Sequence, residues 1–262
     1  MAATPQVRAE SPLDSAQVPE IPYVFRGREL TRKTHRLSSG LPSVDDALGG
    51  GLVRGRINEI VGRAGVGKTS LAAAFLARAT ADGEVAAWID SAAAFDPSSM
   101  RAAGVDLARV LWVGCPGSHP GGARQLEKNF LKAAELVLET GGFGLIVVDF
   151  GDRTLPLMTS AALRMARRAE RTSTAMLILA AHRMCATFAA LTLNLIHSEA
   201  RFSRPSRLAP ALFDGCAIDA RVARNKLGGA GRAATWQAQI DPGIVAPAPS
   251  PASPQTKYFD AR

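Results

Sequence analysis

Short apolar runs alternate with longer helical stretches through most of the chain. The apolar runs have a hydrophobic residue at almost every position, which is typical of strands buried on both faces of a parallel sheet. They fall at residues 57–62, 84–90, 110–114, 144–150 and 175–181. Amphipathic or alanine-rich stretches predict helices at 69–81, 124–140 and 160–172, and Asp96-Pro97 opens a short helix that ends at Gly104. This order predicts an α/β fold with a mostly parallel central sheet and helices on both faces.

The pattern changes near Leu191, where apolar and polar residues begin to alternate with a period of two. Three such stretches follow, TLNLIHSEARF, CAIDARVARNK and ATWQAQI. Alternation of this kind is typical of antiparallel strands with one exposed face. We therefore predict antiparallel strands at the C-terminal end of the sheet.

Both ends of the chain lack a sustained period. Residues 1–36 contain prolines and then a basic cluster, so we predict a flexible basic arm. The cluster is a phosphate-contacting patch, a docking element or a solvated linker. Residues 242–262 are rich in proline and alanine and are predicted to be disordered. A folded core over 37–241 lies between these tails.

One glycine-rich stretch joins the first apolar run to the helix that follows it. It reads GRAGVGKTS and fits the phosphate-loop pattern G-x-x-x-x-G-K-[ST] in the strand-to-helix context that the pattern requires. The backbone N–H groups of such a loop surround a triphosphate, the Lys68 ammonium reaches the outer phosphates, and the Thr69 hydroxyl is a ligand for Mg²⁺. The helix dipole points its positive end at the same anion. A bare glycine-rich turn is the alternative. The predicted ATP-binding residues of this stretch are Gly62, Arg63, Ala64, Gly65, Val66, Gly67, Lys68, Thr69 and Ser70.

A carboxylate near the end of the run 144–150 is the second candidate. Asp149 lies at the C-terminal end of a predicted parallel strand, where ligands of such sheets bind. That position suits it to hold the water shell of a Mg²⁺ ion at the phosphate loop. A helix-capping aspartate is the alternative. Thr69 and Asp149 are therefore the predicted magnesium residues, with ATP and Mg²⁺ as cofactors.

Composition limits the class of protein. At 262 residues and 47% hydrophobic composition, the chain can bury one sizeable core. No apolar run approaches the roughly 18 residues that cross a bilayer, so we expect a cytoplasmic protein without a membrane partner. Three scattered cysteines match no metal spacing and are predicted to be reduced. They are Cys115, Cys185 and Cys216.

The basic balance points to a polyanionic partner. The net charge is +8, and part of it lies on the predicted helix 160–172, where four arginines recur at helical spacing. This stripe is a DNA contact, a site for an acidic partner, or a solvated helix face. Its members are Arg164, Arg167, Arg168 and Arg171.

Several segments in series resemble the ATP-binding core of RecA over roughly residues 37–241. They are LSSGLPSVDDALGGGLVRGRINEIVG, GRAGVGKTS, WIDSAAAFDP, AAGVDLARVLWV, LIVVDF and VARNKLG. The resemblance implies a RecA-like P-loop NTPase core. It makes Asp96 the acid that contacts the base, and it places His182 where the family has a glutamine that senses the γ-phosphate; a strand-end histidine is the alternative. Arg224 and Lys226 match basic residues that reach a neighbouring subunit's ATP in filaments, and pairing with surface acids is the alternative.

The chain departs from the recombinases of that family in their catalytic and DNA-binding parts. Ala92 stands where the family has the glutamate that activates water, and Ser99 replaces the aromatic residue that stacks on adenine. Loss of a positioned general base commonly costs ~10² to 10⁴ in rate, so we expect weak or no ATP hydrolysis. The first DNA-binding loop, after Asp149, is shortened, and the second lacks the family's glycine- and threonine-rich stretch. The N-terminal helix that links filament subunits is not recognisable.

This combination resembles the ImuA-type RecA-like proteins that are encoded with Y-family and DnaE-type error-prone polymerases in bacterial mutagenesis cassettes. The resemblance implies a nucleotide-binding adaptor in translesion DNA synthesis during the SOS response to DNA damage, in the nucleoid-associated cytoplasm. It implies a Y-family polymerase subunit and RecA as partners, one of which would dock on a vacant edge of the sheet. The C-terminal tail also contains a degenerate sliding-clamp peptide, carried by Gln255, Tyr258 and Phe259.

Two other functions stay open at this point. One is a DNA-dependent ATPase of the recombinase type that forms filaments on single-stranded DNA, whose ATP turnover would rise on DNA with a steep salt dependence. The other is a degenerate core that no longer binds nucleotide, in which case replacing Lys68 by alanine would change neither stability nor partner binding.

Overall fold

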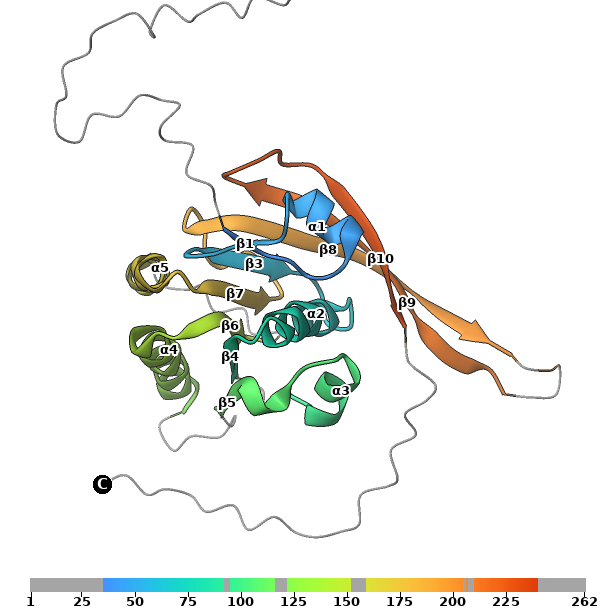
Figure 1. The fold of residues 1–262 in the computed structure, drawn as a ribbon, viewed down its shortest axis with the longest axis horizontal. Coiled ribbons are helices and arrows are strands. Elements are labelled where there is room, and N and C mark those ends of the chain that lie inside the picture. The colour runs from blue at the N-terminus through green and yellow to red at the C-terminus, as the bar shows by residue number, and fades with distance from the viewer. Residues whose placement is uncertain are drawn as a thin grey trace, which may run out of the picture. The chain divides into compact units, whose positions relative to one another are not determined.

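The computed structural model describes residues 35–91, 95–115, 122–151, 159–204, 206 and 210–239. Within them, one eight-stranded sheet has the order β10-β9-β8-β3-β7-β6-β4-β5 (Figure 1). Neighbours in the run from β3 to β5 are parallel, so the predicted mostly parallel sheet is confirmed. The strands of this run are β3 (Ile57–Val61), β4 (Val85–Asp90), β5 (Val110–Gly114), β6 (Phe143–Asp149) and β7 (Ala175–Ala180).

The C-terminal strands complete the sheet beside β3, with one difference from the prediction. They are β8 (Ala189–Ser203), β9 (Leu212–Asn225) and β10 (Ala233–Gln239). β9 is antiparallel to both β8 and β10, as predicted. On its other side, β8 is parallel to β3, a pairing that the sequence pattern did not predict. Its first five residues are all buried, whereas alternating exposure begins only at Asn194.

Helices cover both faces of the sheet. α2 (Lys68–Ala81) and the short α3 (Pro97–Ala102) lie on one face, and α4 (Gly122–Thr140) and α5 (Thr159–Thr172) lie on the other (Figure 1). A short 3-10 helix, Leu107–Arg109, precedes β5. The central strands contribute alternate residues to the two cores, because successive side chains of a strand point to opposite faces. Leu145 and Leu177 join the core under α2, and Ile146 and Ile178 join the core under α5.

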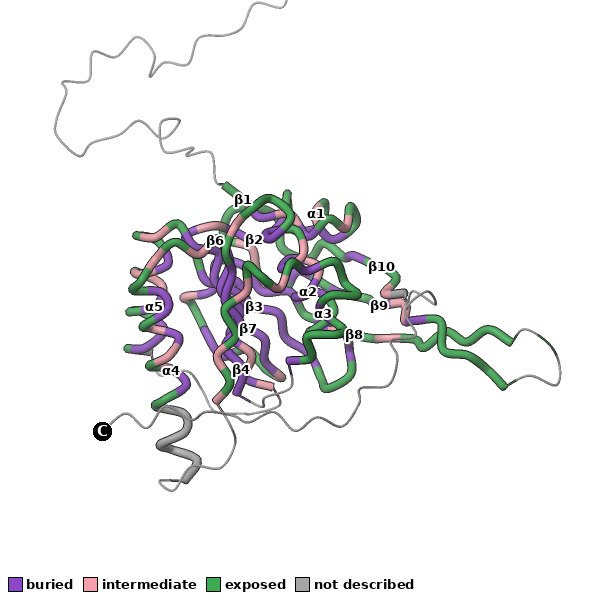
Figure 2. Tube along the Cα trace, turned by 60° about the horizontal axis from the view of Figure 1, so that its bottom comes forward, coloured by how far each residue is buried: buried purple, intermediate pink, exposed green. Residues whose placement is uncertain are grey.

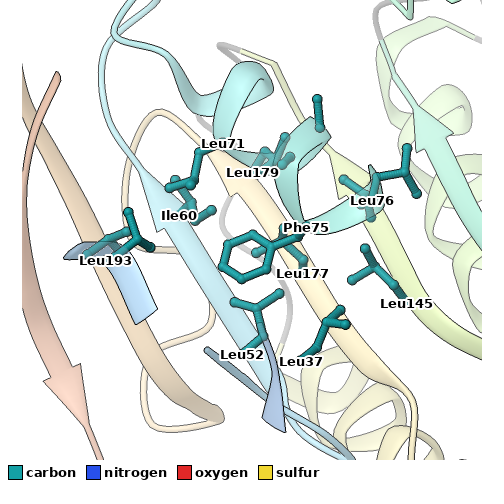
Figure 3. Packing of buried hydrophobic residues seen from close by; sticks show 14 of the residues in the cluster. Leu37, Leu52, Ile60, Leu71, Phe75, Leu76, Leu145, Leu177, Leu179 and Leu193 are labelled. Carbon is teal, nitrogen blue, oxygen red and sulfur yellow. The ribbon is translucent and has the colours of Figure 1, made fainter. Parts of the chain in front are cut away.

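The core under α2 is built from leucines and one phenylalanine. Figure 3 shows the Phe75 ring of α2 directed at the sheet among Leu52 and Leu177. Full burial of one such side chain contributes about 1.5–3 kcal/mol, and these contacts fix α2 against β3 and β7. The helix that begins at Lys68 is therefore held rigidly against the strand that ends at Val61.

A small N-terminal unit packs on the sheet beside β10. β1 (Arg36–Leu37) and β2 (Leu52–Val53) form an antiparallel pair, and α1 (Pro42–Leu48) lies between them in sequence. Gly49 ends α1 with φ +75°, the left-handed conformation that favours glycine at a helix C-terminus. Ser43 Oγ of α1 donates a hydrogen bond to Thr235 O of β10.

The sequence tails, residues 1–34 and 240–262, lie outside the described residues, so the predicted limits of the core stay predictions. All three cysteines are free thiols, as predicted. Among the helices of the described ranges, none is both long and apolar enough to span a membrane.

β8 and β9 continue beyond the rest of the sheet as a two-stranded arm. β3 ends at Val61, which pairs with Asn194, but β8 runs on to Ser203 and stays paired with β9 throughout. Figure 1 shows this arm leaving the body of the sheet, and Figure 2 shows that most of it is exposed. Its base lies directly beside the loop that follows β3.

Candidate functional site

The glycine-rich loop between β3 and α2 has backbone conformations that require glycine. Gly65 has φ +73° and Gly67 has φ +96°, both in the left-handed region. A Cβ atom at Gly67 would lie 2.4 Å from Cδ1 of Ile218 in β9, and one at Gly62 would lie 2.7 Å from Cγ1 of Val66. The loop is therefore packed closely against its own side chains and the base of the β8–β9 arm.

The charges at this loop suit a triphosphate. Lys68 Nζ donates hydrogen bonds to Gly62 O at 2.6 Å and to Arg63 O at 3.1 Å, so the ammonium folds over the loop. The N-terminus of α2 has no side-chain cap and no acidic residue in its first turn, which leaves its N–H groups to an anion. Thr69 and Ser70 are exposed, as a hydroxyl that meets a bound ion requires. These residues fit the phosphates of a nucleotide.

Two carboxylates lie at the same edge of the sheet. Asp149 ends β6 and is in register with Asp90, which ends β4. Asp149 accepts a hydrogen bond from Gly151 N at 2.8 Å, whereas the buried Asp90 accepts one from Phe95 N at 2.7 Å. Asp90 thus orders the segment after β4, while Asp149 is only partly buried. Residues 152–158 are not described, so the helix-capping alternative for Asp149 stays open.

The predicted magnesium site is not a protein-only cluster. In the described part of the chain, no three residues among His, Cys, Asp and Glu gather as a metal site. β7 lies between β3 and β6, which puts Asp149 about 10 Å from the phosphate-loop strand. Mg²⁺ usually keeps several waters and takes phosphate oxygens with one or two protein groups. Thr69 and Asp149 fit that form of binding, and their role stays a prediction.

Asp96 caps the short helix α3. Its carboxylate accepts hydrogen bonds from the backbone N–H groups of Ser98 and Ser99. Hydrogen bonding from Ser99, and then from Ser98, lowers the pKa of Asp96 from 3.8 to about 2. The carboxylate is therefore ionised and has a structural role here, and its contact with a nucleotide base stays a prediction.

His182 lies near the phosphate loop. Ala180, the last residue of β7, pairs with Val61, the last residue of β3, and Ala180 O accepts a hydrogen bond from Gly62 N. The exposed His182 follows two residues later at this edge of the sheet. The position suits a phosphate contact, which stays a prediction beside the alternative of a strand-end histidine.

Arg224 and Lys226 lie elsewhere. Asn225 is in register with Leu191, and through it with Asn58, so this pair lies toward the end of β3 opposite the phosphate loop. A register shift beside Arg224 accompanies a hydrogen bond from its guanidinium to Ala186 O at 2.7 Å, and Lys226 Nζ donates to Thr187 O. Burial lowers the pKa of Lys226, as does the charge of Arg224.

The two side chains therefore bind backbone carbonyls in the same chain and do not meet its phosphate loop. Arg224 and Lys226 thus have backbone carbonyls as partners in place of surface acids, and they lie away from a nucleotide bound at the chain's own phosphate loop. Contact with a nucleotide held by another subunit stays a prediction.

Sequence analysis missed a buried glutamate in the phosphate-loop strand. Glu59 is 1% exposed, and its carboxylate accepts hydrogen bonds from Met184 N at 2.6 Å, Cys185 N at 3.1 Å and Thr192 Oγ1 at 3.2 Å. Burial, and then the charge of Glu59, raise the pKa of the Cys185 thiol. The signal in the sequence was a lone acid in an apolar run, which requires a buried partner.

Glu59 holds the connection between β7 and β8 in place by accepting hydrogen bonds from backbone N–H groups of that connection. Residues 181–188 carry the chain from the C-terminal end of β7 back to the level of Ile57, where β8 begins parallel to β3. The crossing has no helix, and Met184 and Cys185 are buried in the core under α5. The second loop was expected to lack a glycine- and threonine-rich stretch; the structure has a short crossover there that is anchored in the core by Met184 and Cys185.

Two of the four arginines of the predicted stripe on α5 form ion pairs with glutamates of α4. Arg164 forms an ion pair with Glu135 at 2.7 Å, and Arg168 pairs with Glu135 at 3.4 Å and with Glu139 at 3.5 Å. Arg167 and Arg171 are exposed. Two of the four arginines are therefore paired with acids of the neighbouring helix, and the role of the stripe in binding DNA stays a prediction.

Some predicted residues lie outside the described part of the chain. They are Ala92, which follows β4, and the tail residues Gln255, Tyr258 and Phe259. The roles assigned to them stay predictions.

A mostly parallel α/β sheet with G-x-x-x-x-G-K-T between a strand and a helix defines a P-loop protein. The chain belongs to the RecA N-terminal domain family, whose model matches residues 23–194. Membership of this P-loop family implies nucleotide binding.

Similar curated proteins include Protein RecA of Borreliella afzelii (strain PKo), 42% identical over 114 residues, which are 43% of this chain and 29% of that protein. Another is Protein RecA of Cutibacterium acnes, 39% identical over 124 residues, which are 47% of this chain and 33% of that protein. The chain thus matches about a third or less of the length of these relatives. The match to the family model ends at Asn194, where the arm begins.

Proposed function

We propose that this chain is a RecA-like nucleotide-binding accessory protein of bacterial DNA damage-induced mutagenesis. In this role it binds ATP with Mg²⁺, hydrolyses it weakly or not at all, and acts as an adaptor for an error-prone polymerase complex of the Y family and for RecA. Lys68, Thr69 and the loop N–H groups would hold the phosphates. When bound, the magnesium ion would neutralise phosphate charge beside Thr69 and Asp149.

The short crossover after β7 is the observation that carries this proposal. In recombinases the corresponding loop binds DNA, but here two of its N–H groups are bound to the buried Glu59. Ala92 supports the same conclusion, because alanine has no group that orients a water for hydrolysis. A phosphate loop with fitting geometry beside these two losses favours a nucleotide-dependent adaptor over a strand-exchange enzyme.

The free edge of the sheet at β5 supports an adaptor role. In the described chain β4 is the single strand neighbour of β5, whose Leu111 and Trp112 side chains are 45% and 46% exposed. The Trp112 ring stacks on Phe95 with centroids 5.8 Å apart, which fixes its position. Such an edge accepts an extended partner segment through backbone hydrogen bonds.

ATP binding and turnover, measured with and without single-stranded DNA, test the nucleotide part of the proposal. We expect ATP binding that Lys68→Ala strongly weakens, and turnover that DNA hardly changes. Ala92→Glu should raise turnover, because it returns a water-orienting carboxylate. Brisk DNA-stimulated turnover by the unmodified protein would instead establish the recombinase-type ATPase, and a lack of ATP binding by the unmodified protein would establish the degenerate core.

A pull-down with a purified Y-family polymerase subunit tests the edge. We expect Trp112→Lys to weaken capture, and the matched change Leu136→Lys on the exposed side of α4 to leave it intact. Equal capture by the two variants would exclude β5 as the docking edge. The exposed Arg167 and Arg171, and the tail residues Tyr258 and Phe259, are secondary contacts for DNA and a sliding clamp.

A further inference from the structure

The arm presents a long unpaired strand edge. Beyond Asn194, β8 has left β3, and residues 196–203 lie beside β9 alone, with register shifts around Ile196 and between Arg201 and Phe202. In the described structure no strand lies on their other side, so that edge offers a row of backbone N–H and C=O groups. Monomeric proteins usually protect such an edge with prolines, bulges or a covering element, because it is a template for pairing. Here the two register shifts lie at the ends of the segment and leave the residues from His197 to Arg201 in regular pairing.

The arm also carries several large apolar side chains that are exposed to solvent. Phe202 and Phe213 face each other across the two strands with centroids 5.5 Å apart, and they are 62% and 42% exposed. Ile196 and Leu212 add further exposed apolar area. A group of exposed apolar side chains on a strand edge is typical of an interaction surface.

The charge pattern along β8 identifies the partner. Glu199 and Arg201 are two residues apart, so they point to the same face of the strand, and both are exposed. Among the ion pairs of the described residues, neither takes part. If two copies of β8 pair antiparallel about a two-fold axis through Ala200, Glu199 of each copy lies opposite Arg201 of the other. An isologous interface requires self-complementarity of this kind.

The neighbouring registers are disfavoured by the same charges. An axis through Glu199 places the two glutamates opposite each other, and an axis through Arg201 does the same with the arginines, which is destabilising. The axis through Ala200 also places the smallest side chain of the segment at the centre and sets Phe202 opposite Ser198 of the second copy. The charges therefore specify one register.

We propose that the β8 edge of the arm binds a second copy of this chain, and that two arms form a continuous four-stranded ribbon centred on Ala200. The inference is independent of nucleotide binding, because it uses residues beyond the loop and beyond the match to the RecA family. An edge of eight residues makes a small interface, so the dimer constant is on the order of micromolar.

Charge reversal tests the register. Sedimentation velocity over a concentration series should show a dimer for the unmodified protein. Glu199→Arg and Arg201→Glu should each weaken it roughly tenfold or more, because each places two pairs of like charges opposite each other. The double variant Glu199→Arg/Arg201→Glu should restore it, which a folding defect would not do. Arg101→Glu, an equal charge change at an exposed position of α3, should leave the dimer unchanged.

A symmetric crosslink tests the axis. Cys216 lies opposite Ala200 within the arm, so the experiment uses a Cys216→Ala background. There, Ala200→Cys should form an intermolecular disulfide on mild oxidation, because opposite Cα atoms in an antiparallel pair are about 4.5–5.5 Å apart, within disulfide range. Ser203→Cys should not, since its own copy would lie about 20 Å away.

Three results would overturn the proposal. They are a monomer at every concentration, assembly that both single charge reversals leave intact, and a disulfide at Ser203→Cys as fast as that at Ala200→Cys. A monomer at every concentration would mean that the arm binds a different protein. Assembly that survives both charge reversals would mean that the chain self-associates through another surface.

Discussion

Two neighbouring strands, β3 and β7, end at the same edge of the sheet, and the segments that follow them are held in different ways. The phosphate loop after β3 keeps its shape through glycine conformations and close packing, and its N–H groups face outward at the start of α2. The crossover after β7 gives two of its N–H groups to Glu59, inside the protein. One segment therefore leaves N–H groups for a ligand, whereas the other is anchored to the core through Met184 and Cys185.

The largest expected effect comes from releasing the crossover. Glu59→Leu leaves the N–H groups of Met184 and Cys185 and the hydroxyl of Thr192 buried without an acceptor, so we expect a loss of roughly 3–5 kcal/mol in the free energy of unfolding. Chemical denaturation measures it. Glu139→Gln, a change at an exposed glutamate, should cost less than about 0.5 kcal/mol. A loss below about 1 kcal/mol for Glu59→Leu would show that the crossover is not held by this carboxylate.

In the phosphate loop after β3, Lys68→Ala removes the predicted contact of the ammonium with the phosphates of ATP. We expect ATP affinity to fall about 10- to 150-fold, as for loss of one charge-assisted hydrogen bond, while the free energy of unfolding stays within about 0.5 kcal/mol. Calorimetric titration and denaturation measure the two quantities. Arg63→Ala, which removes an exposed neighbouring cation, should change affinity by less than about threefold. Equal effects of both substitutions would mean general charge attraction in place of a cradle.

Alanine substitutions at two glycines of the loop distinguish the cost of backbone strain from the cost of a steric clash. Gly67→Ala meets both a positive φ and Ile218, and we expect a loss of about 1–3 kcal/mol in stability together with weaker ATP binding. Gly65→Ala has open space and should cost only about 1 kcal/mol, the strain of its φ. Thermal unfolding of both variants gives the difference. If Gly65→Ala proved the more damaging, packing against the arm would not be what shapes the loop.

The smallest effect concerns Asp96, outside both segments. Its pKa is lowered to about 2 in the folded protein, so its carboxylate stabilises the fold above the ordinary value of 3.8. That contribution is lost as the pH falls from about 4 to about 2. Asp96→Ala should flatten the pH dependence of stability in this window, whereas the slope of stability against pH near neutrality should not change. An unaltered acid limb in the variant would assign that limb to other carboxylates.

The sequence predicted the parallel core well because each element carries a local signal. The run 144–150 is apolar except for Asp149 and the run 175–181 is apolar throughout, and the structure has β6 and β7 there, with buried central residues. β8 was harder to predict, because its alternating second half suggested an antiparallel strand while its buried first half pairs parallel with β3. The arginines of α5 show the same limit: their spacing was visible, but Glu135, distant in sequence, neutralises two of them.

By itself the sequence determined the phosphate loop and the order of strands and helices, because glycine positions, the spacing of the phosphate loop and hydrophobic periods act over a few residues. Only the tertiary structure decided which groups those elements bring together. It paired Glu59 with a crossover over a hundred residues away, placed Arg224 and Lys226 away from the phosphate loop, and carried β8 past the end of β3. Each of these depends on strand register, which long-range packing sets and no local pattern encodes.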